Sequence, residues 1–216
     1  VGEKPLYYAE ASGVLLFGSE LKALQASGVF SPKIDRGSLA LFMRHGYGPG
    51  PRTIYADVHK LRPGTHARWC QGRPGAVIEE YWRPLDIALA GQASARSISE
   101  QEAELQLEDL LRQSIRGQLV ADVPVGAFLS GGIDSSAVVA LMQRESSRPV
   151  RTFSIGFAED AYNEAHHAKE VACHLGTDHT ELYVSPQQAL DVVPLLPDMY
   201  DEPFADSSQI PTHLVC

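Results

Sequence analysis

The sequence has few cysteines, no long apolar run and no excess of positive charge. Its three cysteines, Cys70, Cys173 and Cys216, form no Cys-x-x-Cys pair and no even-numbered framework, which indicates reduced thiols in a cytoplasmic protein. The longest apolar runs fall well short of the ~20 residues that a membrane-spanning helix needs, and no signal peptide is evident. The net charge of −9 argues against a general nucleic-acid-binding protein, which would present a basic face. Neither a membrane nor a nucleic acid is therefore expected as a partner.

Two common motifs of nucleotide-binding proteins and hydrolases are also missing. No Gly-Lys pair occurs anywhere, which excludes a Walker A loop. Phe128 stands where a nucleophile elbow around Ser130 would need glycine. An initiator Met is absent, and the last seven residues form an apolar stretch, so we expect a piece of a longer protein.

The composition is that of an ordinary globular protein, with 44% hydrophobic and 21% charged residues. The charge changes sign along the chain, from +3 over residues 1–82 to −12 over residues 83–216. A stretch of small, weakly patterned residues follows this change at 88–95 and is typical of a linker. We therefore expect one domain over residues 1–83, a linker over 84–99 and a second domain over 100–216.

The first domain is predicted to be rich in β-structure. Apolar runs at 6–9 and 14–17 flank a turn around Gly13, and residues 65–70 and 76–82 flank a second turn around Gly72. Short helices are expected at 19–25 and 38–45.

The second domain alternates between helices and strands. Ser99 and Glu102 form a capping-box pattern that opens a helix, whose apolar face carries Leu107, Leu110, Leu111, Ser114 and Ile115. A buried strand is predicted at 123–129, a helix at 134–145 and a strand at 151–157; a helix at 164–175 and a strand at 181–184 complete the series. The helix at 134–145 should turn Ala137, Val138, Leu141 and Met142 inward. Gly176 should cap the C-terminal end of the helix at 164–175. This order predicts an α/β fold with a parallel sheet and crossover helices.

The segment 130–136, Ser-Gly-Gly-Ile-Asp-Ser-Ser, lies between a predicted strand and a predicted helix. Its two glycines allow a tight turn and close approach of the backbone to a ligand, and its serines supply hydroxyl donors. Backbone N–H groups of such a turn and of the first helical turn converge on an anion. Asp134 would repel a phosphate unless Mg²⁺ lies between them. The alternative is that Asp134 and Ser135 only cap the helix.

This segment resembles the pyrophosphate loop of the PP-loop ATP pyrophosphatases. Within that superfamily, the chain is similar to the glutamine-hydrolysing asparagine synthetases. The similarity extends in family order over almost the whole chain, through residues 4–8, 19–24, 60–64, 81–82, 122–126, 152–157 and 201–208.

The resemblance implies a fold, a reaction and a set of site residues. The fold would be the C-terminal part of an αββα glutaminase β-sandwich, followed by the first half of a parallel-sheet synthetase domain. The nucleophilic Cys of the glutaminase would precede Val1, and a second pyrophosphate-contacting segment would follow Cys216. No glutaminase catalytic residue is therefore expected among residues 1–83, and the piece alone should be inactive.

The implied reaction makes asparagine from aspartate, ATP and glutamine-derived ammonia, with Mg²⁺, in a cytoplasmic enzyme that could be a homodimer. The resemblance implies that Leu129 and Ile155 line the nucleotide and that Asp134 lies near Mg²⁺. It also implies a phosphate cradle made of Ser130, Gly131, Gly132, Ser135 and Ser136. Two alternatives stay open. One is a PP-loop amidotransferase with another carboxylate acceptor, such as a β-lactam or exopolysaccharide-linked enzyme. The other is a nucleotide-binding module without catalysis.

Several other residues have two interpretations each. His166, His167, Cys173, His174 and His179 form a cluster without the spacing of a zinc site, so a solvated helix face is expected. Cys70 and Cys173 are predicted to pack as small hydrophobic residues. Asp201, Glu202 and Asp206 could form an acidic cluster at a metal–nucleotide site or a solvated turn. Glu164 and Asp201 fall in acidic segments of the family, without an assigned role.

Overall fold

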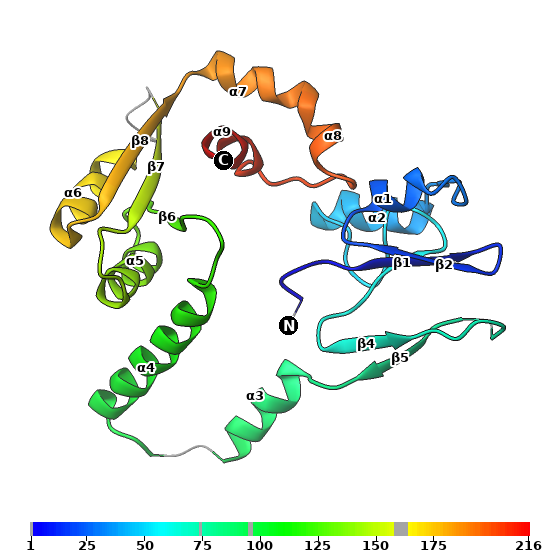
Figure 1. Cartoon of the computed structure of the whole chain (residues 1–216), viewed down its shortest axis with the longest axis horizontal. Coiled ribbons are helices and arrows are strands. Elements are labelled where there is room, and N and C mark those ends of the chain that lie inside the picture. Colours follow the sequence, from blue (N-terminus) through cyan, green and yellow to red (C-terminus); the bar gives the residue numbers. More distant parts are fainter. Residues whose placement is uncertain (1, 74, 95–96, 158–163) are drawn as a thin grey trace. The chain divides into compact units, whose positions relative to one another are not determined.

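The structure is a computed structural model that describes residues 2–73, 75–94, 97–157 and 164–216 (Figure 1). The chain divides into two compact units. The first unit comprises Val1–Ala95 and Pro194–Asp206, and the second comprises Arg96–Val193 and Ser207–Cys216. None of the helices in the described ranges is long and apolar enough to cross a membrane.

The first unit is built on two small antiparallel sheets. Strands β1 (Tyr7–Ala11) and β2 (Val14–Gly18) form a hairpin, and β3 (Val58–Lys60) pairs with the other side of β1. Strands β4 (Thr65–Arg68) and β5 (Val77–Glu80) form the second sheet. Both predicted hairpins are confirmed, whereas β3 has no counterpart in the sequence prediction.

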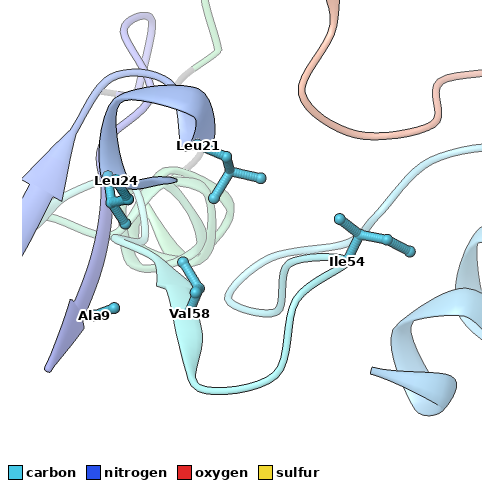
Figure 2. Close-up of a cluster of buried hydrophobic side chains, with 5 residues drawn as sticks. All are labelled: Ala9, Leu21, Leu24, Ile54 and Val58. Atoms are coloured by element: carbon cyan, nitrogen blue, oxygen red, sulfur yellow. The ribbon is translucent and has the colours of Figure 1, made fainter. Parts of the chain in front are cut away.

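Helix α1 packs against the larger sheet and supplies two of the five buried residues of its core. Helix α1 (Leu21–Ala26) follows β2, and α2 (Arg36–His45) ends at Gly46 in the left-handed conformation. Figure 2 shows the buried cluster, in which Leu21 and Leu24 of α1 gather with Ala9 of β1, Val58 of β3 and Ile54. The two helices predicted in this unit are confirmed.

The predicted linker at 84–99 contains helix α3 (Pro84–Ala93), which the structure assigns to the first unit. Pro84 stands at the first helical position, where its missing N–H costs nothing. Short helix α8 (Leu196–Met199), preceded by the 3-10 turn η2 (Val193–Leu195), also lies in the segment that joins the first unit from far along the chain. The domain limits 1–83 and 100–216 stay a prediction.

The second unit contains the parallel sheet that the sequence predicts. Strands β6 (Gly126–Phe128), β7 (Arg151–Phe157) and β8 (Asp178–Val184) run parallel in the order β6-β7-β8. Helix α5 (Ile133–Glu145) connects β6 to β7, and α6 (Ala165–Leu175) precedes β8 and ends at Gly176 in the left-handed conformation. The core of this unit gathers Leu129, Val139, Ala168 and Ala172. The predicted fold class is confirmed.

Three further helices complete the second unit. Helix α4 (Glu100–Gln118) begins at Ser99, whose hydroxyl accepts a hydrogen bond from the Glu102 N–H as the sequence predicts. Helices α7 (Pro186–Val192) and α9 (Gln209–Val215) have no counterpart in the sequence prediction.

Some details of burial differ from the prediction. In α5 the fully buried residue is Val139, whereas Val138 is 42% exposed, because Val139 faces the core against α6. The predicted strand at 123–129 shortens to three residues at the edge of the sheet, so Val123 is 71% exposed. The predicted apolar face of α4 is largely exposed, and ion pairs attach this helix to α5.

Candidate nucleotide-binding site

The segment 130–136 forms the junction between β6 and α5, as the sequence predicts. Strand β6 ends at Phe128, and α5 begins at Ile133. Leu129 is 2% exposed, and its N–H donates to the Phe153 carbonyl oxygen at 2.9 Å. The loop therefore starts from a position that both the core and the neighbouring strand fix.

Gly131 lets helix α6 approach this loop closely. Its φ is +78°, and a Cβ built on it would lie 2.8 Å from the Ala168 N and the His167 Cβ. These atoms belong to the backbone or the base of a side chain, so they cannot rotate away. Only glycine is compatible with both the left-handed conformation and this approach.

The first turn of α5 has backbone donors that no side chain in the described part of the chain caps. Gly132 is the N-cap residue and carries no side chain, so it offers no capping oxygen to the first N–H groups of this 13-residue helix. These donors and the positive end of the helix dipole favour an anion.

The serine hydroxyls bond within the loop. The Ser135 hydroxyl accepts a hydrogen bond from the Ser130 N–H at 3.3 Å and lies 3.0 Å from the Ser130 hydroxyl. The Ser130 hydroxyl also accepts from the Gly132 N–H at 3.3 Å. The Ser136 hydroxyl is buried and has no hydrogen-bond partner among the described residues. Hydroxyl donors are thus gathered at the start of α5.

Asp134 does not cap the helix. It occupies the first turn of α5, where its carboxylate makes no hydrogen bond or ion pair with any residue in the described ranges. The sequence left capping open as an alternative for this residue, and the geometry does not support it. An unpaired carboxylate beside helix-terminal donors is a suitable oxygen ligand for Mg²⁺.

A cavity of about 380 Å³ opens at the carboxyl end of the parallel sheet, beside the loop. It brings together Leu129, Ser130 and Ile155 of the predicted set with Glu164. Open parallel sheets bind ligands at this end of their strands. The other predicted residues, Gly131, Gly132, Asp134, Ser135 and Ser136, lie along the loop and the first turn of α5 and do not line the cavity.

Helix α9 supplies a wall of the cavity that the sequence analysis missed. Three of its residues and its N-cap residue contribute: Pro211, Thr212 and Val215, with Ser208 at the N-cap. No periodic apolar signal marks this short helix, and Pro211 argues against a helix by composition. The only signal was its place directly after the matched segment 201–208.

Asp201 and Glu202 form neither a solvated turn nor part of this cavity. Their side chains are 12% and 10% exposed and lie in the first unit. The Glu202 carboxylate accepts a hydrogen bond from the Ile54 N–H at 2.6 Å and pairs with Lys60 at 2.6 Å. Burial, followed by the charge of Glu202, raises the pKa of Tyr7 to about 12. The Asp201 carboxylate accepts a hydrogen bond from the Leu21 N–H, so both carboxylates are occupied by protein groups.

The histidine and cysteine cluster separates in the structure. His166, His167 and His174 are exposed on α6, and no group of three potential metal ligands occurs among the residues that the structure describes. His179 lies on β8, where Nδ1 is 2.9 Å from the Thr152 hydroxyl and Nε2 is 3.2 Å from the Ser154 hydroxyl. Burial lowers the pKa of His179 and so favours the neutral ring.

All three cysteines are free and exposed. The prediction that Cys70 and Cys173 pack as small hydrophobic residues is wrong. Cys70 follows the end of β4, and Cys173 lies on a face of α6 that the core does not cover.

Comparison with known proteins assigns both parts of the chain. A family model described as asparagine synthase matches residues 106–216, and one described as a glutamine amidotransferase domain matches residues 1–82. The chain is 32% identical over 218 residues to asparagine synthetase [glutamine-hydrolyzing] 1 of Bacillus subtilis, which covers 99% of this chain and 32% of that protein. It is 31% identical over 219 residues to putative asparagine synthetase [glutamine-hydrolyzing] 2 of Methanocaldococcus jannaschii, covering 100% of this chain and 41% of that protein.

A third relative has a different name. Amidase chyE of Penicillium rubens is 30% identical over 193 residues, which cover 82% of this chain and 27% of that protein. The chain thus spans about a third of the length of the curated relatives that it matches. With the sheets of the first unit, the parallel sheet of the second and the loop at the end of β6, these matches show that the chain belongs to the glutamine-hydrolysing asparagine synthetase family.

Proposed function

We propose that the complete protein is an ATP-dependent ligase that makes asparagine from aspartate and glutamine-derived ammonia, and that residues 129–136 with Ile155 bind the ATP. The observation that carries this proposal is the glycine loop at the end of β6, which joins uncapped helix donors to an apolar cavity. This arrangement suits a ligand with a planar base and a polyphosphate.

Each end of the nucleotide would meet matching chemistry. Leu129 and Ile155 would contact the base, since both line the cavity, one directly after β6 and the other on the neighbouring strand β7. The phosphates would lie at the loop, where the N–H groups of the first turn of α5 can donate to them. The Ser135 hydroxyl, which donates to the Gly132 carbonyl oxygen, and the buried Ser136 hydroxyl would have to turn toward the phosphates to add to these donors.

The free carboxylate of Asp134 suits a metal-assisted reaction. We propose that Asp134 would hold Mg²⁺, which when bound would shield the phosphate charge that this carboxylate otherwise repels. The unpaired state of Asp134 among the described residues supports this role.

In the proposed reaction, the side-chain carboxylate of aspartate attacks the α-phosphorus of ATP. The bond to pyrophosphate breaks, an aspartyl-adenylate forms, and ammonia then displaces AMP to give asparagine. The loop donors would stabilise the negative charge that grows on the leaving pyrophosphate, and fixed donors of this type typically contribute about 10²–10³-fold in rate. We further propose a cytoplasmic location, which the three free cysteines support, and a homodimer, which light scattering would check.

A second candidate is the same activation chemistry with a different carboxylate acceptor. This candidate is supported by the similarity, over 82% of this chain, to a relative that is named an amidase. The residues that bind the nucleotide would be the same in both cases, and only the acceptor would differ.

ATP–pyrophosphate exchange by the complete protein tests the proposal. We expect exchange that depends on added aspartate and on Mg²⁺. Exchange that requires another carboxylic acid would support the second candidate. ATP binding without exchange, whichever acid is added, would contradict both and indicate a nucleotide-binding module.

A further inference from the structure

The segment Pro194–Asp206, here called the strap, connects the two units in an unusual way. It belongs to the first unit, although α7 before it and α9 after it belong to the second. The chain therefore passes from the second unit into the first and then back into the second, where it forms α9.

Asp201 attaches the strap to the beginning of helix α1. Its carboxylate accepts a hydrogen bond from the N–H of Leu21, the first residue of α1. The N-cap residue Glu20 makes no such bond with its own side chain, so Asp201 caps α1 from 180 residues away. The Lys22 ammonium lies 3.6 Å from the Asp201 carboxylate and donates to the carbonyl oxygen of Asp198 at 3.0 Å.

Glu202 attaches the strap to Ile54 and to Lys60 of β3 in the same unit. Its bonds to the Ile54 N–H and to Lys60 are both 2.6 Å long, and the Lys60 and Glu202 side chains are 23% and 10% exposed. Three residues after Glu202, the Ala205 N–H donates to the Gly46 carbonyl oxygen at 2.8 Å. Short bonds between charged and largely buried groups are the stronger class of hydrogen bonds in proteins.

The strap ends where the wall of the candidate nucleotide site begins. Only two residues of the chain lie between Ala205, which is bound to the first unit, and Ser208, which lines the cavity of the second. An extended chain spans at most about 3.6 Å per residue, so these two positions, three residue steps apart, are no more than about 11 Å from each other. This limit comes from covalent geometry and holds for any arrangement of the units.

We propose that Asp201 and Glu202 are positioning residues that hold the start of α9, so that the wall of the nucleotide cavity depends on docking of the strap in the glutamine amidotransferase-type unit. This proposal rests on the proposed function. Neither carboxylate touches the nucleotide; each restricts the strap and so lowers the conformational entropy that α9 loses when a ligand binds.

The test compares Glu202→Gln with the matched variant Glu79→Gln in the complete protein. Both changes remove one carboxylate charge from the first unit, but Glu79 pairs with His66 and Arg68 on the exposed β4–β5 hairpin and does not contact the strap. Amide hydrogen exchange of residues 209–215 and the Kd for ATP are measured in each. We expect Glu202→Gln to raise the exchange rate of residues 209–215 and the Kd for ATP, each by roughly 3- to 30-fold. Glu79→Gln should change neither the exchange rate nor the Kd.

Two outcomes would overturn the proposal. Faster exchange confined to the strap and its partners, with α9 and the Kd unchanged, would make Glu202 a local structural anchor only. Equal effects of Glu202→Gln and Glu79→Gln would point to loss of charge in general. Should Glu202→Gln not fold, Asp201→Asn is measured in the same way, because it removes the other attachment. Absence of ATP binding by the wild type would contradict the proposed function, whereas the exchange of α9 would still decide the docking role.

Discussion

Replacing Gly131 with alanine tests the closest backbone approach in the candidate site. The new Cβ would lie 2.8 Å from the Ala168 N and 2.9 Å from the His167 backbone carbon, and the residue would keep a φ of +78°. Both the loop and α6 contribute to the core around Leu129, so neither can move away without loss of packing. The substitution should therefore destabilise the second unit and displace the donors of the loop.

The size of the effect follows from two separate costs. A non-glycine residue in the left-handed conformation costs roughly 1–2 kcal/mol. Forcing an extra carbon into a well-packed contact typically costs a further 1–3 kcal/mol, or about 2–5 kcal/mol for both. Gly176→Ala separates them, because Gly176 has a φ of +68° and nothing within 4 Å of its Cβ position. That variant should lose roughly the first amount alone.

The assay must report on the second unit. Both tryptophans, Trp69 and Trp82, lie in the first unit, so their fluorescence does not follow the loop. Amide hydrogen exchange of α5 and α6 does report on the loop, and the protection of these helices should fall more in Gly131→Ala than in Gly176→Ala. The Kd for ATP should rise at least about tenfold in Gly131→Ala and stay unchanged in Gly176→Ala. Equal loss of protection in the two variants would refute the close approach of α6 to the loop.

Local signals were sufficient where a residue has a conformational reason to be at its position. Ser99 caps α4, and Gly176 ends α6 in the left-handed conformation. Strand β7 has the predicted limits, and the loop follows β6 as expected. In each case the determining interaction lies within a few residues along the chain.

Elements that depend on distant partners could not be predicted in this way. Strand β3 has three residues, Val-His-Lys, without a strand signal of its own, and it exists because it pairs with β1 about fifty residues earlier. The choice between Val138 and Val139 as the buried residue of α5 likewise depends on where α6 packs.

The same limit applies to the candidate site. The glycine loop could be found from the sequence because its chemistry is contiguous. The cavity wall from α9 and the partners of Glu202 could not, since Ile54 is 148 residues away from that carboxylate. Two open interpretations of an acidic cluster were thus replaced by a third, which only the fold could show.

Three further variants test the charges of the second unit. Asp134→Asn should lower aspartate-dependent exchange by roughly 10- to 100-fold with little change in unfolding free energy; unchanged turnover would contradict the metal role. Glu145 has its pKa lowered from 4.5 to about 2, chiefly by its hydrogen bond to Arg116 of α4. The stability that this carboxylate contributes is therefore complete above about pH 4.5 and lost toward pH 2. In Glu145→Gln, the unfolding free energy measured with urea should depend less on pH across that range. Burial lowers the pKa of His179 below its ordinary 6.5, so the unfolded chain binds this proton more readily than the folded one. The resulting stability is full above pH 6.5 and falls as the pH drops below it. His179→Gln should remove this part of the pH dependence, whereas the same change at the exposed His66 should leave it intact. An equal slope of unfolding free energy against pH between about pH 6.5 and 5 in His179→Gln and wild type would show that burial of this ring does not favour its neutral form.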